Sequence, residues 1–275
     1  MPTHDSRRHI VLALATACAA AAAVLAAAAP AGAASGVRYV ALGDSYSSGL
    51  GAGSYIPSSG GCARSTRAYS ALWAGANRPV SYISAACAGA TTADVLSRQL
   101  SALSGSTTLV SITIGGNDVG FSSVMETCVL RSTSTCVAAI NAAEGEVSSE
   151  LPGVLDRVLA AITAHAPGAR VVVLGYPHLY DLARSADCIG LSTTDRTDLN
   201  QAADLLDGQI QAAAARHGDV FADVRAAFAG HENCDGASSW LHALNFFDLS
   251  ESYHPTAAGQ SGGYLPAFSA SAGAS

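Results

Sequence analysis

The apolar residues of this chain of 275 residues fall into two alternating patterns. Short apolar runs rich in β-branched residues are typical of buried strands, and they occur at residues 37–42, 80–84, 109–114, 170–174 and 220–223. Between them, apolar residues recur at helical spacing, as Val154, Leu155, Val158, Leu159 and Ile162, and as Leu199, Ala203, Leu206, Ile210 and Ala213. Strands that alternate with helices predict an α/β protein with a parallel sheet.

Local signals mark the ends of several elements. Ser192-x-x-Asp195 is a capping-box pattern and Gly218 is a stop signal, so a helix is expected between them. Thr91-x-x-Asp94 predicts a second helix start. Loops or frayed ends are expected at residues 104–108, at residues 131–136 and in the tail from residue 269.

The first 33 residues differ from the rest of the chain. Arg7 and Arg8 give a basic start, residues 10–29 are apolar and rich in alanine, and residues 31–33 form a small-x-small pattern. This order is typical of a secretory signal peptide, so we expect cleavage after Ala33, a mature domain at 34–275 and export from the cell. A retained membrane anchor fits less well, because alanine inserts weakly into membranes and a processing site follows directly.

Charge and length narrow the possible partners. Removal of residues 1–33 takes away one aspartate and two arginines, which changes the formal charge from −7 to −8. An acidic surface poor in Lys and Arg argues against nucleic acid and anionic membranes as binding partners. The remaining length of about 240 residues suits one core. We therefore expect a single domain that is secreted, monomeric and free of a stable membrane anchor.

Six cysteines lie beyond the leader: Cys62, Cys87, Cys128, Cys136, Cys188 and Cys234. An even number in an exported chain indicates three disulfides, for which fifteen connectivities are possible. We favour pairing of sequence neighbours, 62 with 87, 128 with 136 and 188 with 234. A zinc site is the rival interpretation, but the sequence contains neither Cys-x-x-Cys nor His-Glu-x-x-His. No metal or cofactor is expected.

Three candidate functional residues follow the first three predicted strands. Ser45 ends the sequence Gly43-Asp44-Ser45, Gly89 follows the second strand, and Asn117 follows two glycines after the third. Because the carboxyl ends of parallel strands meet at one edge of the sheet, where ligands bind, we expect these residues to share one rim.

This combination fits ester hydrolysis by a serine nucleophile. Ser45 would attack the ester, and His254, which precedes Pro255, would act as the general base. The backbone N–H groups of Ser45 and Gly89 and the side-chain NH₂ of Asn117 would stabilise the oxyanion. Either the Glu251 carboxylate or a backbone carbonyl near residues 251–252 would orient the imidazole. Each residue alone is an ordinary turn residue, and the combination carries the prediction.

Other motifs in the sequence are weaker. The glycine-rich segment 49–53 lacks the Gly-Lys-Ser/Thr ending of a phosphate-binding loop. Gly43-x-Ser45-x-Ser47 also breaks the Gly-x-Ser-x-Gly pattern of the α/β-hydrolase nucleophile elbow. An apolar run at 240–249, just before His254, is either core or the wall of an acyl-binding groove.

The ordered blocks Gly43-Asp44-Ser45, Gly89, Gly115-Gly116-Asn117-Asp118 and His254-Pro255 resemble those of the SGNH (GDSL-type) hydrolase superfamily, most closely its secreted actinobacterial lipases and esterases. The resemblance implies an SGNH hydrolase fold, which is a three-layer α/β/α sandwich with a five-stranded parallel sheet. It also implies a serine esterase or lipase acting on lipid or small acyl esters without a cofactor. Tyr46 stands where the name of the first block expects leucine, and this side chain need not touch the reacting atoms. Glu251 stands where many relatives carry aspartate.

Rival functions remain open at this point. Within ester hydrolysis, a phospholipase A1-like acyl hydrolase and a carbohydrate acetylesterase are alternatives. From a different class, the chain could be an exported binding protein that kept the fold and lost turnover. The presence of Ser45, Gly89, Asn117 and His254 together argues against that last alternative.

Overall fold

The computed structural model describes residues 36–188, 190–245 and 248–273. The predicted signal peptide at 1–33 lies outside the described residues, so the leader and the domain boundary at residue 34 stay predictions. In the part of the chain that the structure describes, no helix is long and apolar enough to cross a membrane.

Within the described residues the core is a sheet of five parallel strands in the order β2-β1-β3-β4-β5. The strands are β1 (Arg38–Gly43), β2 (Ser81–Ser84), β3 (Leu109–Thr113), β4 (Arg170–Leu174) and β5 (Val220–Ala222). Each lies within about a residue of its predicted position. The central strands β1 and β3 are buried along nearly their whole length, because helices cover both faces of the sheet.

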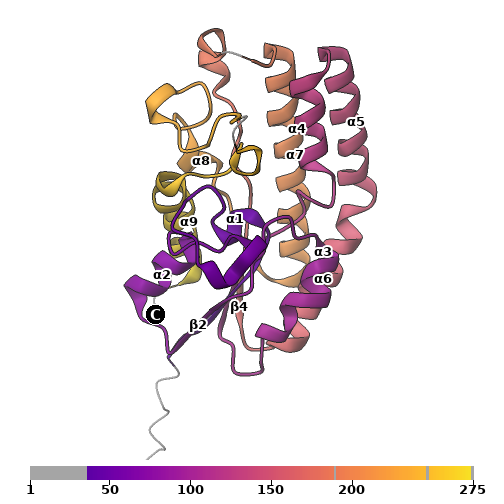
Figure 1. Ribbon diagram of the computed structural model, residues 1–275. Helices are drawn as coiled ribbons and strands as arrows, with labels where there is room; N and C mark the ends of the chain where they lie inside the picture. The colour runs from indigo at the N-terminus through magenta and orange to yellow at the C-terminus, as the bar shows by residue number, and fades with distance from the viewer. Residues whose placement is uncertain (1–35, 189, 246–247, 274–275) are drawn as a thin grey trace, which may run out of the picture. The chain divides into compact units, whose positions relative to one another are not determined.

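Helices lie on both sides of this sheet, as Figure 1 shows. The helices are α1 (Ser45–Ser48), α2 (Tyr69–Asn77), α3 (Thr92–Asp94), α4 (Phe121–Leu130), α5 (Thr133–Ser149), α6 (Leu151–His165), α7 (Thr193–His217), α8 (Arg225–Phe228) and α9 (Leu265–Ala272). One layer contains α2, α8 and α9, and the other contains α3, α6 and α7, with α5 packed against α7 and α4 packed against α5. The predicted three-layer α/β/α sandwich is confirmed.

The capping signals are confirmed, whereas two predicted loops are wrong. Ser192 and Asp195 form the capping box of α7, which ends at Gly218, and Thr91 caps α3 in the same way. Residues 133–136 instead open α5, because the Ser132 side chain accepts a hydrogen bond from the Thr135 amide and caps the helix. The tail is helical as far as Ala272.

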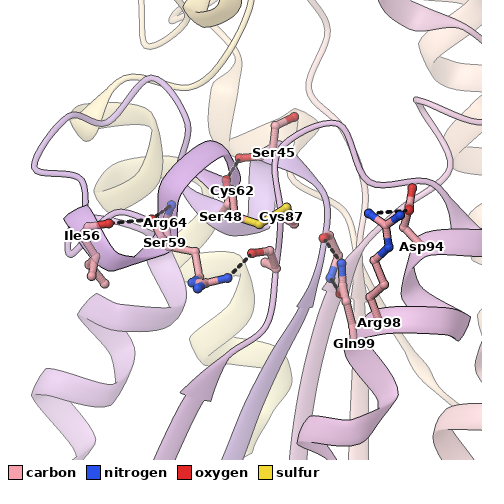
Figure 2. Close-up of a disulfide and its surroundings, with 12 residues drawn as sticks. Ser45, Ser48, Ile56, Ser59, Cys62, Arg64, Cys87, Asp94, Arg98 and Gln99 are labelled. Atoms are coloured by element: carbon pink, nitrogen blue, oxygen red, sulfur yellow. Dashed lines mark hydrogen bonds and ion pairs between the residues drawn. A yellow bond between two sulfur atoms is a disulfide. The ribbon is translucent and has the colours of Figure 1, made fainter.

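Three disulfides join the pairs that neighbour pairing predicted: Cys62–Cys87, Cys128–Cys136 and Cys188–Cys234. The Cys128–Cys136 bond links α4 to the first turn of α5. The Cys62–Cys87 bond ties the segment before α2 to the loop that carries Gly89, beside the Ser45 segment (Figure 2). On loop-closure entropy each bond contributes roughly 2–4 kcal/mol to stability.

Candidate active site

Ser45 is held at the end of β1 by a sharp turn. Gly43 has φ +115° there, and a Cβ on it would lie 2.3 Å from the Thr113 carbonyl oxygen, so this position requires glycine. Gln99 fixes the same residue: it accepts from the Gly43 amide at 2.7 Å and donates to the Gly43 carbonyl at 2.9 Å (Figure 2). Ser45 is therefore the first residue of α1, directly at the carboxyl edge of the sheet.

The Asp44 carboxylate stabilises this turn through hydrogen bonds. Its carboxylate accepts hydrogen bonds from the Tyr46 amide at 3.0 Å, from the Thr113 hydroxyl at 2.6 Å and from the Tyr176 hydroxyl. Burial raises the pKa of Asp44 to about 6, although the hydrogen bonds from Thr113 and Tyr176 act in the opposite direction. Asp44 thus holds the nucleophile loop in place and does not face His254.

The His254 side chain contacts the Ser45 hydroxyl at the carboxyl edge of the sheet. Its Nε2 lies 2.7 Å from the Ser45 Oγ, and its Nδ1 lies 3.1 Å from the Ser252 carbonyl oxygen. A neutral imidazole in this position has Nδ1–H donating to the carbonyl and Nε2 free to accept the serine proton. Burial lowers the pKa of His254 to about 4, so the ring is neutral at neutral pH.

The Glu251 carboxylate, one of the two groups predicted to orient this ring, is not the one that contacts it. Glu251 accepts a hydrogen bond from the Tyr55 hydroxyl, and the same hydroxyl accepts from the Gly51 amide at 2.9 Å. The carboxylate therefore ties the His254 loop to the loop after α1. The other predicted arrangement, a backbone carbonyl near residues 251–252, is the one that the structure has.

The three predicted oxyanion donors lie at the mouth of the same cavity as Ser45 and His254. The Ser45 amide is at the first position of α1, where no intrahelical acceptor exists. Gly89 has φ +76° in a loop fixed by the Cys62–Cys87 bond and by the Ala88 amide, which donates to the Cys62 carbonyl at 3.1 Å. The rim therefore gathers the residues that the strand ends predicted.

Asn117 and Asp118 connect the third loop to the second. The Asn117 Nδ2 donates to the Ala90 carbonyl at 3.0 Å, which leaves its second N–H directed elsewhere. The Asp118 carboxylate accepts from the Thr92 hydroxyl at 2.6 Å and from the Thr92 amide. Asp118 is a loop anchor like Asp44, and the two contacts hold the Gly89 loop against the Asn117 loop.

An apolar slot of about 370 Å³ extends from this rim between α4, α5 and α7. Side chains spaced three or four residues apart form its walls, Ile140, Ala143, Glu144 and Val147 from α5 and Leu199, Ala202, Ala203 and Leu206 from α7. Phe121 and Val124 of α4 complete it. Because the facing residues include alanines, the helices leave space between them where larger side chains would fill it.

The slot lies elsewhere than the predicted groove at 240–249. Trp240 stacks on the His231 ring with centroids 3.6 Å apart, and Leu241 is buried in the core. Neither residue lines the slot. Phe246 and Phe247 lie outside the described residues. Core packing is therefore the finding for Trp240, Leu241 and Leu244, whereas Leu249 is exposed.

Tyr46 is a residue whose importance the sequence did not reveal. Its side chain lines the mouth of the slot, and its ring centroid lies 5.2 Å from that of His254. The sequence reasoning did not require this side chain to touch the site, yet its ring packs on the imidazole of His254. Its position directly after Ser45 was the available signal.

The pH dependence of turnover tests the state of His254. Because a general base must be neutral, we expect kcat/KM to be nearly constant from about pH 8 down to about pH 5 and to fall roughly tenfold per unit below about pH 4. The unfolded chain binds this proton more readily, so folding stability also falls between about pH 6.5 and 4, and fluorescence must confirm the folded state at each pH. A midpoint near 6.5 would contradict the lowered pKa.

In the described part of the chain, no group of three or more His, Cys, Asp and Glu side chains is arranged to hold a metal ion.

Comparison with known proteins places this geometry in context. The model of the GDSL-like Lipase/Acylhydrolase family matches residues 41–261. Lipase 1 of Streptomyces coelicolor is 58% identical over 234 residues, which are 85% of this chain and 86% of that protein. The crystal structure of phospholipase A1 from Streptomyces albidoflavus NA297 matches with a TM-score of 0.83 and 54% identity, over 86% of this chain and 99% of that one. The extracellular lipase of Streptomyces rimosus matches with a TM-score of 0.83 and 50% identity, over 86% and 99% of the two chains.

Proposed function

The chain belongs to the GDSL-like lipase/acylhydrolase family and is a carboxylic ester hydrolase, and from this premise we propose that it cleaves the acyl esters of lipids through an acyl-enzyme on Ser45. The observation that carries the proposal is the 2.7 Å contact between the Ser45 Oγ and the His254 Nε2 at the mouth of an apolar slot. Nucleophile, base and a site for an acyl chain are thus contiguous.

Acylation begins when the Ser45 Oγ attacks the ester carbonyl carbon and its proton passes to the His254 Nε2. The carbonyl oxygen becomes an oxyanion, which accepts hydrogen bonds from the amides of Ser45 and Gly89 and from the Asn117 NH₂. His254 then gives its proton to the leaving alcohol as the carbon–oxygen bond breaks. The acyl group is left on Ser45.

Deacylation repeats these steps with water as the nucleophile. His254 takes a proton from the water, whose oxygen attacks the acyl carbonyl carbon, and the same donors hold the second oxyanion. Collapse releases the carboxylic acid and returns the proton to the Ser45 Oγ. Throughout, the Ser252 carbonyl accepts the Nδ1–H bond and keeps the same tautomer in use.

The slot favours a lipid substrate over an acetylated sugar. Its lining is mainly aliphatic, and Ile140 to Val147 on α5 spans about 10 Å along the helix axis, far more than an acetyl group occupies. Each acyl methylene buried there contributes about 0.8 kcal/mol, or roughly fourfold in affinity. A phospholipase A1-like preference is compatible with the same slot, and dependence of turnover on the phospholipid head group would reveal it. An acetylesterase would release acetate from acetylated xylan and show no gain with longer chains.

Filling the slot should shorten the preferred acyl chain. Ala202 lies on the α7 wall, so Ala202→Phe is expected to lower kcat/KM for a long-chain p-nitrophenyl ester at least tenfold and leave the acetate ester within about threefold. Ala212→Phe, on an exposed part of α7, is the matched control and should change neither. Equal loss on both esters would place the acyl chain outside this slot.

Secretion as a monomer completes the proposal. Three disulfides suit an oxidising compartment, and a relative is described as an extracellular lipase. Every group of the site comes from one chain, so turnover needs no partner subunit. Detection of the mature protein in culture medium and light scattering of the purified protein test these two points.

Covalent labelling decides between an enzyme and an inactive binding protein. A fluorophosphonate should modify the native chain on Ser45 with release of fluoride, and Ser45→Ala should not react. Hydrolysis of p-nitrophenyl esters by the same preparation should be lost in that variant. A native chain that is folded but neither labelled nor active would overturn the proposed function.

A further inference from the structure

The orientation of His254 depends on a short piece of unusual backbone. Its Nδ1 is held by a carbonyl, that of Ser252, and a carbonyl is placed only as well as the backbone that carries it. Tyr253 lies between these two residues and has φ +66°, a left-handed conformation that a residue with a Cβ rarely adopts. Something must hold Tyr253 in this conformation for the imidazole to face Ser45.

Tyr46 holds it from the nucleophile side. The Tyr46 hydroxyl donates to the Tyr253 carbonyl at 2.9 Å, and both residues are buried. The Tyr253 amide in turn donates to the His242 carbonyl at 2.9 Å, so both ends of the strained residue are fixed. Loss of the Tyr46 hydroxyl would leave the Tyr253 carbonyl without this donor and favour relaxation of its backbone.

The Tyr46 ring acts on the imidazole as well. It packs against His254 with centroids 5.2 Å apart, and its other side meets Tyr176 edge-on at 5.0 Å. Tyr176 donates to Asp44, which in turn accepts from the Tyr46 amide, so the ring is set within the same framework as the nucleophile turn. Burial raises the pKa of Tyr46 far above its usual range, so the hydroxyl remains a donor at every pH of interest.

We propose that Tyr46 is a positioning residue that couples the two halves of the dyad: from the position after Ser45 it holds the Ser252–His254 backbone and the imidazole ring in the reactive arrangement. This inference rests on the proposed function and adds a role for the side chain that replaces the leucine of the GDSL block. A leucine there would fill space but could not donate a hydrogen bond to Tyr253. The hydroxyl takes over part of the orienting task that the Glu251 carboxylate does not perform.

Three single variants separate this role from general stability. Tyr46→Phe removes the hydroxyl and keeps the ring, and we expect kcat to fall about tenfold with KM within about twofold. Tyr69→Phe is the matched control, since Tyr69 is equally buried and its hydroxyl contacts Ser47 and Ser111 and not the His254 loop. The kcat of Tyr69→Phe should stay within about twofold of the native value, even if its Tm falls as far as that of Tyr46→Phe. Glu251→Gln should change kcat by no more than about threefold.

Two further readouts report on the imidazole directly. The rate of Ser45 labelling by a fluorophosphonate should fall in Tyr46→Phe in parallel with kcat. The downfield proton NMR signal of the His254 Nδ1–H should shift or broaden in Tyr46→Phe and remain in Tyr69→Phe. These changes are not expected from a loss of stability alone.

The outcomes distinguish this inference from the proposed function. If Tyr46→Phe and Tyr69→Phe have equal kcat while the native chain is labelled on Ser45, the positioning role is overturned and the hydrolase stands. If Glu251→Gln loses more activity than Tyr46→Phe, the carboxylate orients the ring and the inference is also overturned. If the native chain itself is neither labelled nor active, the proposed function fails first.

Discussion

Replacement of His254 by glutamine is expected to lower kcat at least about 10⁴-fold. The Ser45 Oγ is a weak nucleophile unless its proton is accepted as it attacks, and the His254 Nε2, 2.7 Å away, is placed to accept it. Glutamine fills a similar space but cannot take up the proton at neutral pH. Binding of the ester in the slot should persist, so KM is expected to change far less than kcat.

Steady-state hydrolysis of a p-nitrophenyl ester, with the thermal unfolding midpoint as the folding check, measures this effect. His165→Gln is the control, because His165 is exposed at the end of α6 and bonds to the Ala161 carbonyl of its own helix. The double variant Ser45→Ala/His254→Gln should be no slower than either single variant, since the two groups act as one unit. If kcat of the folded variant fell less than about 100-fold, His254 would not be the general base.

The strand ends explain why the rim could be predicted from sequence. The sheet order β2-β1-β3-β4-β5 reverses direction between β1 and β3, and ligands bind at such a switch point. Ser45 follows β1 and Asn117 follows β3, so locating the strands was enough to bring these residues together. His254 was found by its chemistry and the Pro255 that follows, because no strand precedes it directly.

The walls of the slot were not predictable in the same way. The start of α5 is rich in serine and threonine, which also favour turns, and a side-chain cap at Ser132 decides for the helix. The slot itself is lined by small side chains such as Ala143 of α5 and Ala202 of α7. Space between helices depends on tertiary packing, which the sequence pattern does not report. The apolar residues at 240–249 therefore gave no sign that the cavity lies between α4, α5 and α7.

The partner of His254 was also beyond sequence reasoning. A separation of three residues lets the Glu251 carboxylate or a nearby carbonyl reach the imidazole, so spacing alone left both open. The Tyr55 hydroxyl, from a loop almost 200 residues earlier in the chain, donates a hydrogen bond to the Glu251 carboxylate. The left-handed conformation of Tyr253, which presents the Ser252 carbonyl, is likewise set by contacts from Tyr46 and His242.

Asn117→Ala is expected to lower kcat about 10²- to 10³-fold, or roughly 3–4 kcal/mol of transition-state stabilisation. One N–H of the Asn117 NH₂ donates to the Ala90 carbonyl at 3.0 Å, and the side chain lines the cavity mouth beside Ser45 and Gly89. The second N–H is the one available to the oxyanion. Since that charge forms only in the transition state, kcat and kcat/KM should fall together.

The same side chain also steadies the Gly89 loop, so the test must separate donation to the substrate from support of the loop. Asn117→Asp keeps the shape but puts a negative carboxylate beside the oxyanion, and it should therefore be slower than Asn117→Ala. Asn77→Ala, which removes a similar side-chain contact to the Trp73 carbonyl on α2, should lose less than about threefold. If Asn117→Ala matched Asn77→Ala in kcat, the oxyanion would be held by the two backbone amides without Asn117. If Asn117→Asp were faster than Asn117→Ala, support of the loop would outweigh donation to the substrate.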